Sequence, residues 1–155
     1  MSDPLDQLLG TWAGTGSGHY PTIAPFGYTE EITFGSVPTK PFLAYQQRTR
    51  HATEDRPLHA ESGYWRWVGD GATIEVVLAH PTGIAEILEG RLQPVVDGFD
   101  LELASRAISL TTTAKDVRTT TRRFALRGDE LRYEVAMGSV GLPLQPHLVA
   151  VLQRR

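Results

Sequence analysis

The stretch GTWAGTGSG, residues 10–18, sets one tryptophan and four glycines at alternate positions. They are Gly10, Trp12, Gly14, Gly16 and Gly18. Alternate residues of a strand share one face, so this face is bare backbone except for one indole ring. Such a face permits sharp coiling of the strand, or the close approach of another segment or of a flat ligand. The stretch therefore predicts the first strand of a barrel, with Trp12 filling space at one end.

The same glycines do not form a phosphate-binding loop. A P-loop ends in Lys followed by Ser or Thr and leads into a helix, and neither feature follows residue 18. Nucleotide binding is therefore disfavoured.

A short helix is expected before this strand. Asp3 can cap it, Pro4 fits its first position, and Gly10 can end it. Its narrow apolar stripe consists of Leu5, Leu8 and Leu9. Because a helix of under two turns is not stable alone, we expect it to plug or cover part of the fold.

The rest of the chain has a period of two residues. In one segment Tyr28, Glu30, Ile32 and Phe34 alternate with Thr29, Glu31 and Thr33. This period is typical of half-buried antiparallel strands, and turn signals such as Asp97-Gly98 and Gly128-Asp129 separate them. We expect strands near residues 11–20, 27–35, 41–50, 58–67, 73–80, 84–93, 98–104, 107–115, 118–127 and 130–138, and a final extended or helical piece over 146–153. No repeat or linker interrupts the pattern, which predicts a single domain over residues 1–155.

About ten regularly spaced strands fit either a sandwich or a closed barrel. Ten up-and-down strands close into a barrel wider than the eight-stranded size that side chains fill, which leaves a ligand cavity. A sandwich core would instead be packed solid. Two threonine runs, Thr111–Thr113 and Thr119–Thr121, fit a cavity wall better than a packed core. We therefore expect an all-β fold, a ten-stranded antiparallel barrel with a short N-terminal helix.

Composition excludes several classes of function. The 155 residues hold 15 Lys and Arg against 18 Asp and Glu, a formal net charge of −3, which disfavours binding to nucleic acid or anionic membranes. The absence of Cys excludes disulfides, thiolate-bound metals and cysteine nucleophiles. The first residues do not resemble a signal peptide, and no apolar run approaches the ~20 residues that span a bilayer. A cytoplasmic protein is expected.

One histidine stands out near the C-terminus. Pro143 and Pro146 fix the backbone that leads into His147, in an otherwise apolar segment. An imidazole in apolar surroundings needs a partner for each ring nitrogen. The spacing alone leaves two interpretations open: a hydrogen-bonded histidine, or a metal or haem ligand.

The other ionisable residues form no recognisable catalytic motif. The chain has no His-Glu-x-x-His and no Gly-x-Ser-x-Gly, which leaves a zinc hydrolase and a serine hydrolase unsupported. Five carboxylates scattered over the strands are expected to face solvent: Glu30, Glu31, Glu61, Glu75 and Glu86.

Taken together, these segments resemble the nitrobindin family of small haem-binding β-barrels. Residues 10–16 match its Gly-x-Trp-x-Gly-x-Gly signature, and residues 143–148, PLQPHL, match its closing motif. Further blocks appear in the family's order between them: Tyr20-Pro21-Thr22-Ile23, Tyr28-Thr29-Glu30-Glu31-Ile32, Lys40-Pro41-Phe42-Leu43-Ala44-Tyr45, His59-Ala60-Glu61-Ser62-Gly63-Tyr64 and Pro81-Thr82-Gly83. The short Trp motif also occurs in lipocalins, whereas the ordered set is specific to nitrobindins.

The resemblance implies one haem b per chain with ferric resting iron, and His147 as its axial ligand. By the same resemblance Thr22 and Lys40 lie near the haem. His59 is expected to line the pocket opposite His147 without coordinating the iron. His19, His51 and His80 are expected on the surface or at strand ends.

The resemblance also implies an activity, namely binding of nitric oxide and isomerisation of peroxynitrite to nitrate. Two alternatives stay open at this point: a non-catalytic haem carrier or nitric oxide sensor, and a haem-free lipocalin-like carrier of an apolar ligand. A homodimer through barrel edges or the N-terminal helix is a further open question.

Overall fold

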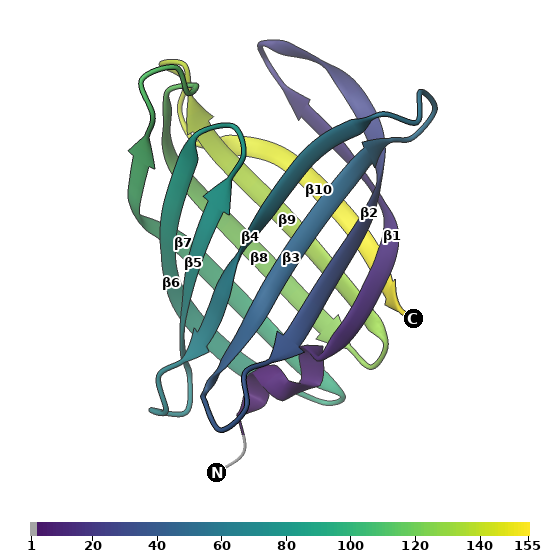
Figure 1. The fold of residues 1–155 in the computed structure, drawn as a ribbon, viewed down its shortest axis with the longest axis vertical. Coiled ribbons are helices and arrows are strands. Elements are labelled where there is room, and N and C mark those ends of the chain that lie inside the picture. The colour runs from purple at the N-terminus through teal and green to yellow at the C-terminus, as the bar shows by residue number, and fades with distance from the viewer. Residues whose placement is uncertain (1–2) are drawn as a thin grey trace.

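The computed structural model describes residues 3–155, which form a closed barrel of ten antiparallel strands (Figure 1). The strands are β1 (Gly10–Tyr20), β2 (Ile23–Ser36), β3 (Phe42–His51), β4 (Pro57–Trp67), β5 (Thr73–His80), β6 (Ile84–Val95), β7 (Gly98–Leu110), β8 (Val117–Arg127), β9 (Glu130–Ser139) and β10 (Gln145–Arg154). Each strand pairs with the next in sequence, and β1 pairs with β10 to complete the ring. The predicted up-and-down barrel is confirmed. Closure leaves no free sheet edge.

Two details of the predicted strand pattern were wrong. The segments 98–104 and 107–115 are not separate strands, because β7 runs without a break from Gly98 to Leu110. The pairing with β6 shifts by one residue at Arg106, and this bulge keeps the strand continuous where the alternation breaks. The tenth strand is instead the final piece, β10. Thr111–Thr113 consequently lie exposed in a turn and do not line a cavity.

A short 3-10 helix, η1 (Pro4–Leu8), closes one end of the barrel (Figure 1). The Asp3 side chain accepts a hydrogen bond of 2.8 Å from the Leu5 backbone, which caps the helix as expected. Leu5 and Leu8 are fully buried against the strands. The Trp12 indole nitrogen donates to the Leu8 carbonyl at 2.8 Å, so Trp12 joins the first strand to this plug.

Aromatic packing fills the half of the barrel next to the helix. The Trp65 ring lies 5.1 Å from Phe34 and 4.9 Å from Phe124, measured between ring centroids, and both pairs meet edge to face. Beyond this layer the barrel opens into a cavity of about 700 Å³ at the end opposite the helix. The packed half therefore acts as a rigid base for the hollow half.

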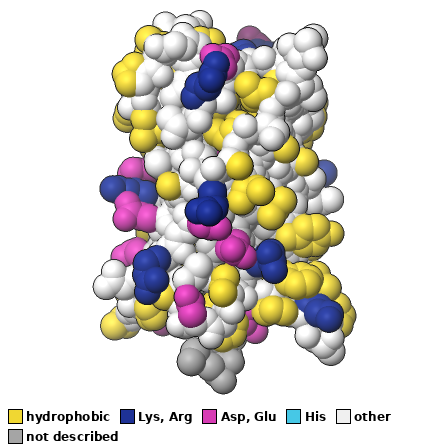
Figure 2. All heavy atoms as spheres, turned by 90° about the vertical axis from the view of Figure 1, so that its left-hand side faces the viewer, with side chains coloured by type: hydrophobic (Ala, Val, Ile, Leu, Met, Phe, Trp, Pro, Cys, Tyr) yellow, Lys and Arg dark blue, Asp and Glu magenta, His cyan; other side chains and the backbone are white. Residues whose placement is uncertain are grey.

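The outer surface carries charges of both signs. Figure 2 shows basic and acidic side chains next to one another on one side of the barrel. Exposed ion pairs such as Arg123–Glu102 join neighbouring strands on the outer surface, and each is worth at most about 1 kcal/mol. Among residues 3–155 no helix is long and apolar enough to cross a membrane.

Candidate functional site

The site is the cavity in the open half of the barrel. Side chains from nearly all strands line it, and its volume of about 700 Å³ suits a ligand of cofactor size. The mouth is largely apolar, with Phe26, Leu58, Ile84 and Leu148 on its wall. The deeper part carries ionisable groups instead. The mouth also carries two cations, Arg56 and Lys115, in the turns after β3 and β7.

His147 enters this cavity from a bulge in β10. Pro146 pairs with Ala136 and Leu148 with Val135, which leaves His147 as the extra residue between them. Its Nδ1 donates to the His19 carbonyl oxygen at 2.9 Å. Because Nδ1 carries the proton, Nε2 keeps a free lone pair, which is what a metal ligand requires.

The ring of His147 is also held by packing. Tyr20 meets it edge to face, with centroids 5.6 Å apart. The Tyr20 hydroxyl is itself fixed, because it accepts from the Ser139 backbone at 2.9 Å and donates to the Met137 carbonyl at 3.1 Å. Burial lowers the pKa of His147, so the neutral imidazole is the form present at neutral pH.

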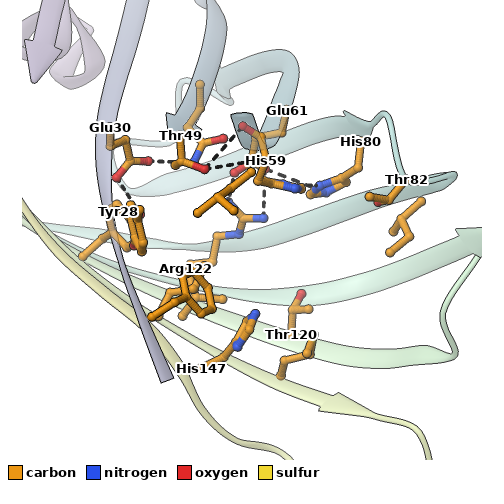
Figure 3. A pocket seen from close by; sticks show the side chains of 18 of the residues that line it. Tyr28, Glu30, Thr49, His59, Glu61, His80, Thr82, Thr120, Arg122 and His147 are labelled. Atoms are coloured by element: carbon orange, nitrogen blue, oxygen red, sulfur yellow. Dashed lines mark hydrogen bonds and ion pairs between the residues drawn. The ribbon is translucent and has the colours of Figure 1, made fainter. Parts of the chain in front are cut away.

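Two further histidines of the cavity form a pair (Figure 3). His59 on β4 and His80 on β5 have their Nε2 and Nδ1 atoms 3.0 Å apart. His80 was expected on the surface or at a strand end, and the second of these holds. His80 does end β5, but its side chain is only 8% exposed and points inward. The interpretation of His59 as a residue of the pocket wall agrees with its place in the structure.

Below the histidine pair lies a buried charge cluster. Arg122 on β8 binds both carboxylate oxygens of Glu61, at 2.9 and 3.0 Å, and one oxygen of Glu86 at 2.6 Å. His80 Nε2 and the Thr120 hydroxyl each donate to Glu86 at 2.8 Å. Burial alone would raise the pKa of Glu86, but Arg122 and these two hydrogen bonds lower it to about 2. Glu86 is therefore a carboxylate at neutral pH.

A second buried carboxyl group behaves in the opposite way. Glu30 accepts from the Tyr133 hydroxyl at 2.6 Å and from the Gln47 amide at 2.7 Å, and Tyr133 also bonds the Tyr28 hydroxyl at 2.7 Å. Burial raises the pKa of Glu30 to about 7, because these neutral donors offset only part of the desolvation. The pKa values of the two carboxyl groups are thus shifted in opposite directions within one cavity.

The sequence-based expectation for the carboxylates was therefore wrong for three of the five. Glu30, Glu61 and Glu86 are buried in the cavity wall, with exposed fractions of 5%, 6% and 3%. Glu31 and Glu75 are partly exposed and pair with surface arginines, as expected of solvent-facing residues.

Comparison with known proteins identifies the family of this barrel. Residues 1–154 match the model of the family described as "THAP4-like, heme-binding beta-barrel domain". The chain belongs to this family of haem-binding barrels. The resemblance to nitrobindins found in the sequence motifs is thereby confirmed.

The relatives and solved structures agree with this assignment. "Peroxynitrite isomerase 1" of Mycolicibacterium paratuberculosis is 52% identical over 151 residues, 97% of this chain and 92% of the relative. "Peroxynitrite isomerase 2" of Mycobacterium marinum is 52% identical over 153 residues, 99% of this chain and 94% of the relative. The crystal structure of Rv2717c from M. tuberculosis superimposes with a TM-score of 0.94 at 47% identity, and covers 100% of this chain and 99% of that one.

The residues present fit a haem. His147 offers a lone pair on Nε2 and has its other nitrogen fixed by the His19 carbonyl, the arrangement that orients metal-ligating histidines. The apolar mouth suits a flat, largely apolar macrocycle. His147 and the wall around it are therefore the part of this haem-binding barrel that can hold the group.

The two other residues expected near the haem lie in different places. Thr22 is exposed in the turn between β1 and β2, on the rim of the mouth, beside Ile23 of the cavity wall. Lys40 lies in the turn between β2 and β3, at the end closed by the helix, and is not part of the cavity wall. The expectation for Lys40 is corrected here: the barrel's length separates its backbone from His147, because β2 and β3 run from one end to the other.

The alternating glycines of this haem-binding barrel lie where close contacts leave no room for a side chain. A Cβ atom on Gly16 would lie 2.4 Å from the Tyr28 ring and 2.6 Å from the Val149 carbonyl oxygen. A Cβ on Gly14 would meet the Val151 carbonyl at 2.0 Å. Gly10 adopts φ +122°, which favours glycine where the chain leaves the helix. Trp12 is fully buried inside the barrel, whereas Gly10 is exposed.

His59, Glu61 and His80 also form the one group among residues 3–155 whose composition suits a metal ion. The contacts describe a hydrogen-bonded chain instead. Both oxygens of Glu61 are already held by Arg122. The His59 and His80 ring centroids are 5.1 Å apart while their nearest nitrogens are 3.0 Å apart, so the rings meet nearly end to end, as an N–H···N bond requires.

Proposed function

We propose that this protein holds one haem b through Nε2 of His147, with ferric resting iron, and isomerises peroxynitrite to nitrate. The observation that carries the proposal is the His147–His19 hydrogen bond at the cavity mouth, which leaves Nε2 as the ligand atom. The names of the relatives at about 50% identity supply the reaction.

The haem supplies an electrophilic metal centre for the substrate anion and the reactivity that rearranges its bonds. The chain's own residues supply position and surroundings. The His19 carbonyl holds Nδ1 of His147, and Tyr20 packs against its ring. The orientation of Nε2, the proposed ligand atom, is therefore fixed. Peroxynitrite and nitrate have the same atoms and charge, so the overall reaction needs no external oxidant or reductant.

Two more residues are proposed to face the bound haem: Thr22 from the rim and His59 from the cavity wall. His59 is proposed to remain uncoordinated, because the 3.0 Å hydrogen bond to His80 holds its ring against β5. A haem held by His147 would then stay accessible to nitric oxide or peroxynitrite.

The deep charge cluster argues against an apolar ligand as the natural occupant. A carrier of apolar molecules would leave Glu61, Glu86 and Arg122 facing the ligand without water. The remaining rival is a haem carrier or nitric oxide sensor that has the same site and no catalysis.

The experiment loads the purified protein with haemin and mixes it with peroxynitrite in a stopped-flow instrument. We expect a Soret band that saturates at one haem per chain. Peroxynitrite decay should be faster than with the same concentration of free haemin, with nitrate as the main product. A saturating Soret band without faster decay would support the carrier or sensor, and the absence of haem binding would reject both.

A further inference from the structure

The His59–His80 pair continues into Glu86 and forms a directed chain of hydrogen bonds. Glu86 is a carboxylate and can only accept, so His80 Nε2 carries the proton that bridges the 2.8 Å between them. A neutral His80 then has its lone pair on Nδ1. That nitrogen lies 3.0 Å from His59 Nε2, which is the donor when His80 is neutral. The charge on Glu86 thus determines the tautomer of His59 through two successive hydrogen bonds, with His80 between them.

The consequence is a lone pair on His59 Nδ1. Among residues 3–155 this nitrogen has no hydrogen-bond partner, and it is not among the buried unpaired atoms of the protein. His59 belongs to the wall of the same cavity as His147, from which it stands four strands away around the ring. The cavity therefore contains one oriented proton acceptor that is separate from the proposed iron ligand.

Around His59, burial, His80 and Arg122 oppose the proton that it would accept, and Glu61 and Glu86 favour it. The charged and titratable groups that face it are Glu61 on its own strand, His80 on β5, Glu86 on β6 and Arg122 on β8. His80 Nε2 also lies 3.8 Å from Glu61, so an imidazolium at His80 would sit between two carboxylates. Burial lowers the pKa of His59, which keeps it neutral and able to accept a proton at neutral pH.

We propose that His59, oriented by His80 and Glu86, is a general base that deprotonates weak-acid ligands on their way to the haem. For peroxynitrous acid, the O–H bond breaks, its electron pair stays on oxygen, and an N–H bond forms at His59 Nδ1. The Nε2 proton of His59 then passes to His80 Nδ1, which leaves the positive charge beside Glu86. The anion remains in the cavity, and the proton returns to water after nitrate leaves.

Within the described residues, His59 is the group that would touch the substrate, and His80 and Glu86 are positioning residues. Thr120 belongs with them, because its hydroxyl holds the second oxygen of Glu86 at 2.8 Å. The proposal takes its substrate from the proposed function. The test below uses hydrogen cyanide, which binds ferric haem as the anion but enters largely as the acid, and therefore needs only haem binding.

The experiment compares cyanide and nitric oxide association with the ferric haem protein between pH 6 and pH 8 in three variants. Glu75→Gln is the matched control, since Glu75 is a strand carboxylate that pairs with Arg66 on the surface. We expect His59→Gln to slow cyanide association about 100-fold and Glu86→Gln to slow it about tenfold, in the range of general-base effects. Nitric oxide has no proton to lose, so its association should stay within about twofold. Glu75→Gln should change neither.

Equal slowing of both ligands would show a structural role and overturn the proposal, as would a wild-type cyanide rate in His59→Gln. If His59→Gln fails to take up haem, the proposal is tested by the cyanide association rate of Glu86→Gln and by the tautomer of His59 in the haem-free protein. Nitrogen-15 NMR of the haem-free wild type should show His59 protonated on Nε2 and bare on Nδ1. The opposite tautomer would reject the base. A positive cyanide result without peroxynitrite isomerisation would reject the proposed function and leave the base standing.

Discussion

Arg122 on β8 crosses the interior of the barrel to Glu61 on β4, where two hydrogen bonds of 2.9 and 3.0 Å join them. Further along the same two inward faces, Phe124 packs against Trp65 with ring centroids 4.9 Å apart. The ion pair is thus the last layer before the aromatic core. It separates the packed half of the barrel from the cavity and forms the cavity floor.

Replacing Arg122 by Met should destabilise the protein by about 3–5 kcal/mol, because Glu61 and Glu86 would stay buried without a cation. The neighbouring Arg123→Met is the control. Its ion pair with Glu102 is about 70% exposed, so its loss should cost no more than about 1 kcal/mol. Urea unfolding of both variants measures the difference. Similar losses in the two would show that the floor does not depend on its charge pair.

Glu30→Gln should remove a pH dependence of stability. The folded-state pKa of about 7 lies above the ordinary value of 4.5, so the folded protein holds a proton that the unfolded chain releases. The wild type should therefore lose stability, relative to this variant, as the pH rises from about 4.5 through 7, by at most about 3 kcal/mol. Gln47 can turn its unpaired Oε1 toward the new amide. The control is Glu31→Gln on the outer face, and parallel unfolding curves for wild type and Glu30→Gln would reject the shift.

The sequence contained more information about the site than its first interpretation used. Glu30 lies on the same face of its strand as Tyr28, Ile32 and Phe34, which are all buried. The alternation itself therefore places Glu30 inward. Glu61 likewise shares the face of Trp65, four residues on. Treating each carboxylate as solvent-facing gave charge more weight than periodicity. In a barrel with a cavity, an inward carboxylate is tolerated when another strand brings a partner.

Some features of the fold follow from the local sequence, whereas the contacts of the site depend on strand pairing that the sequence alone does not display. The barrel, its end plug and the inward Trp12 follow from periodicity and capping. The contact of Arg122 with Glu61 joins residues 61 positions apart, and the His147–His19 bond joins residues 128 apart. His80 becomes a site residue only because β5 lies beside β4. Register between strands, rather than local sequence, brings these groups together.

Gly16→Val should disturb the cavity wall. The new side chain would collide with the Tyr28 ring, 2.4 Å from the Cβ position, and Tyr28 bonds the Tyr133 hydroxyl. We expect a loss of about 1–3 kcal/mol from overpacking, together with weaker haem uptake. Gly35→Val is the control, because a Cβ there meets no atom within 4 Å. Thermal unfolding and haemin titration check both, and unchanged values for Gly16→Val would mean that Tyr28 moves aside freely.

His147→Ala should abolish tight haem binding while leaving the barrel folded. The chain has no Cys, and His59 on β4 is held by His80 and stands four strands away from His147, so it is not placed to take over the lost ligand's role. Haemin titration followed by the Soret band measures the affinity, and circular dichroism confirms the strands. His19→Ala serves as control, since His147 bonds the carbonyl of residue 19 and not its side chain. A wild-type Soret spectrum in His147→Ala would show that another residue is the ligand.

Acidification should release the haem by protonating His147. Iron and a proton compete for Nε2, so occupancy is complete where the imidazole is neutral and falls as the pH drops through its pKa. Burial lowers that pKa, which moves the release below the ordinary histidine value of 6.5. We expect the Soret band of the bound form to persist at pH 7 and to be lost by about pH 4. Circular dichroism at each pH shows whether the barrel is still folded when the haem leaves. Occupancy that stays constant over this range in a folded barrel would contradict ligation by histidine.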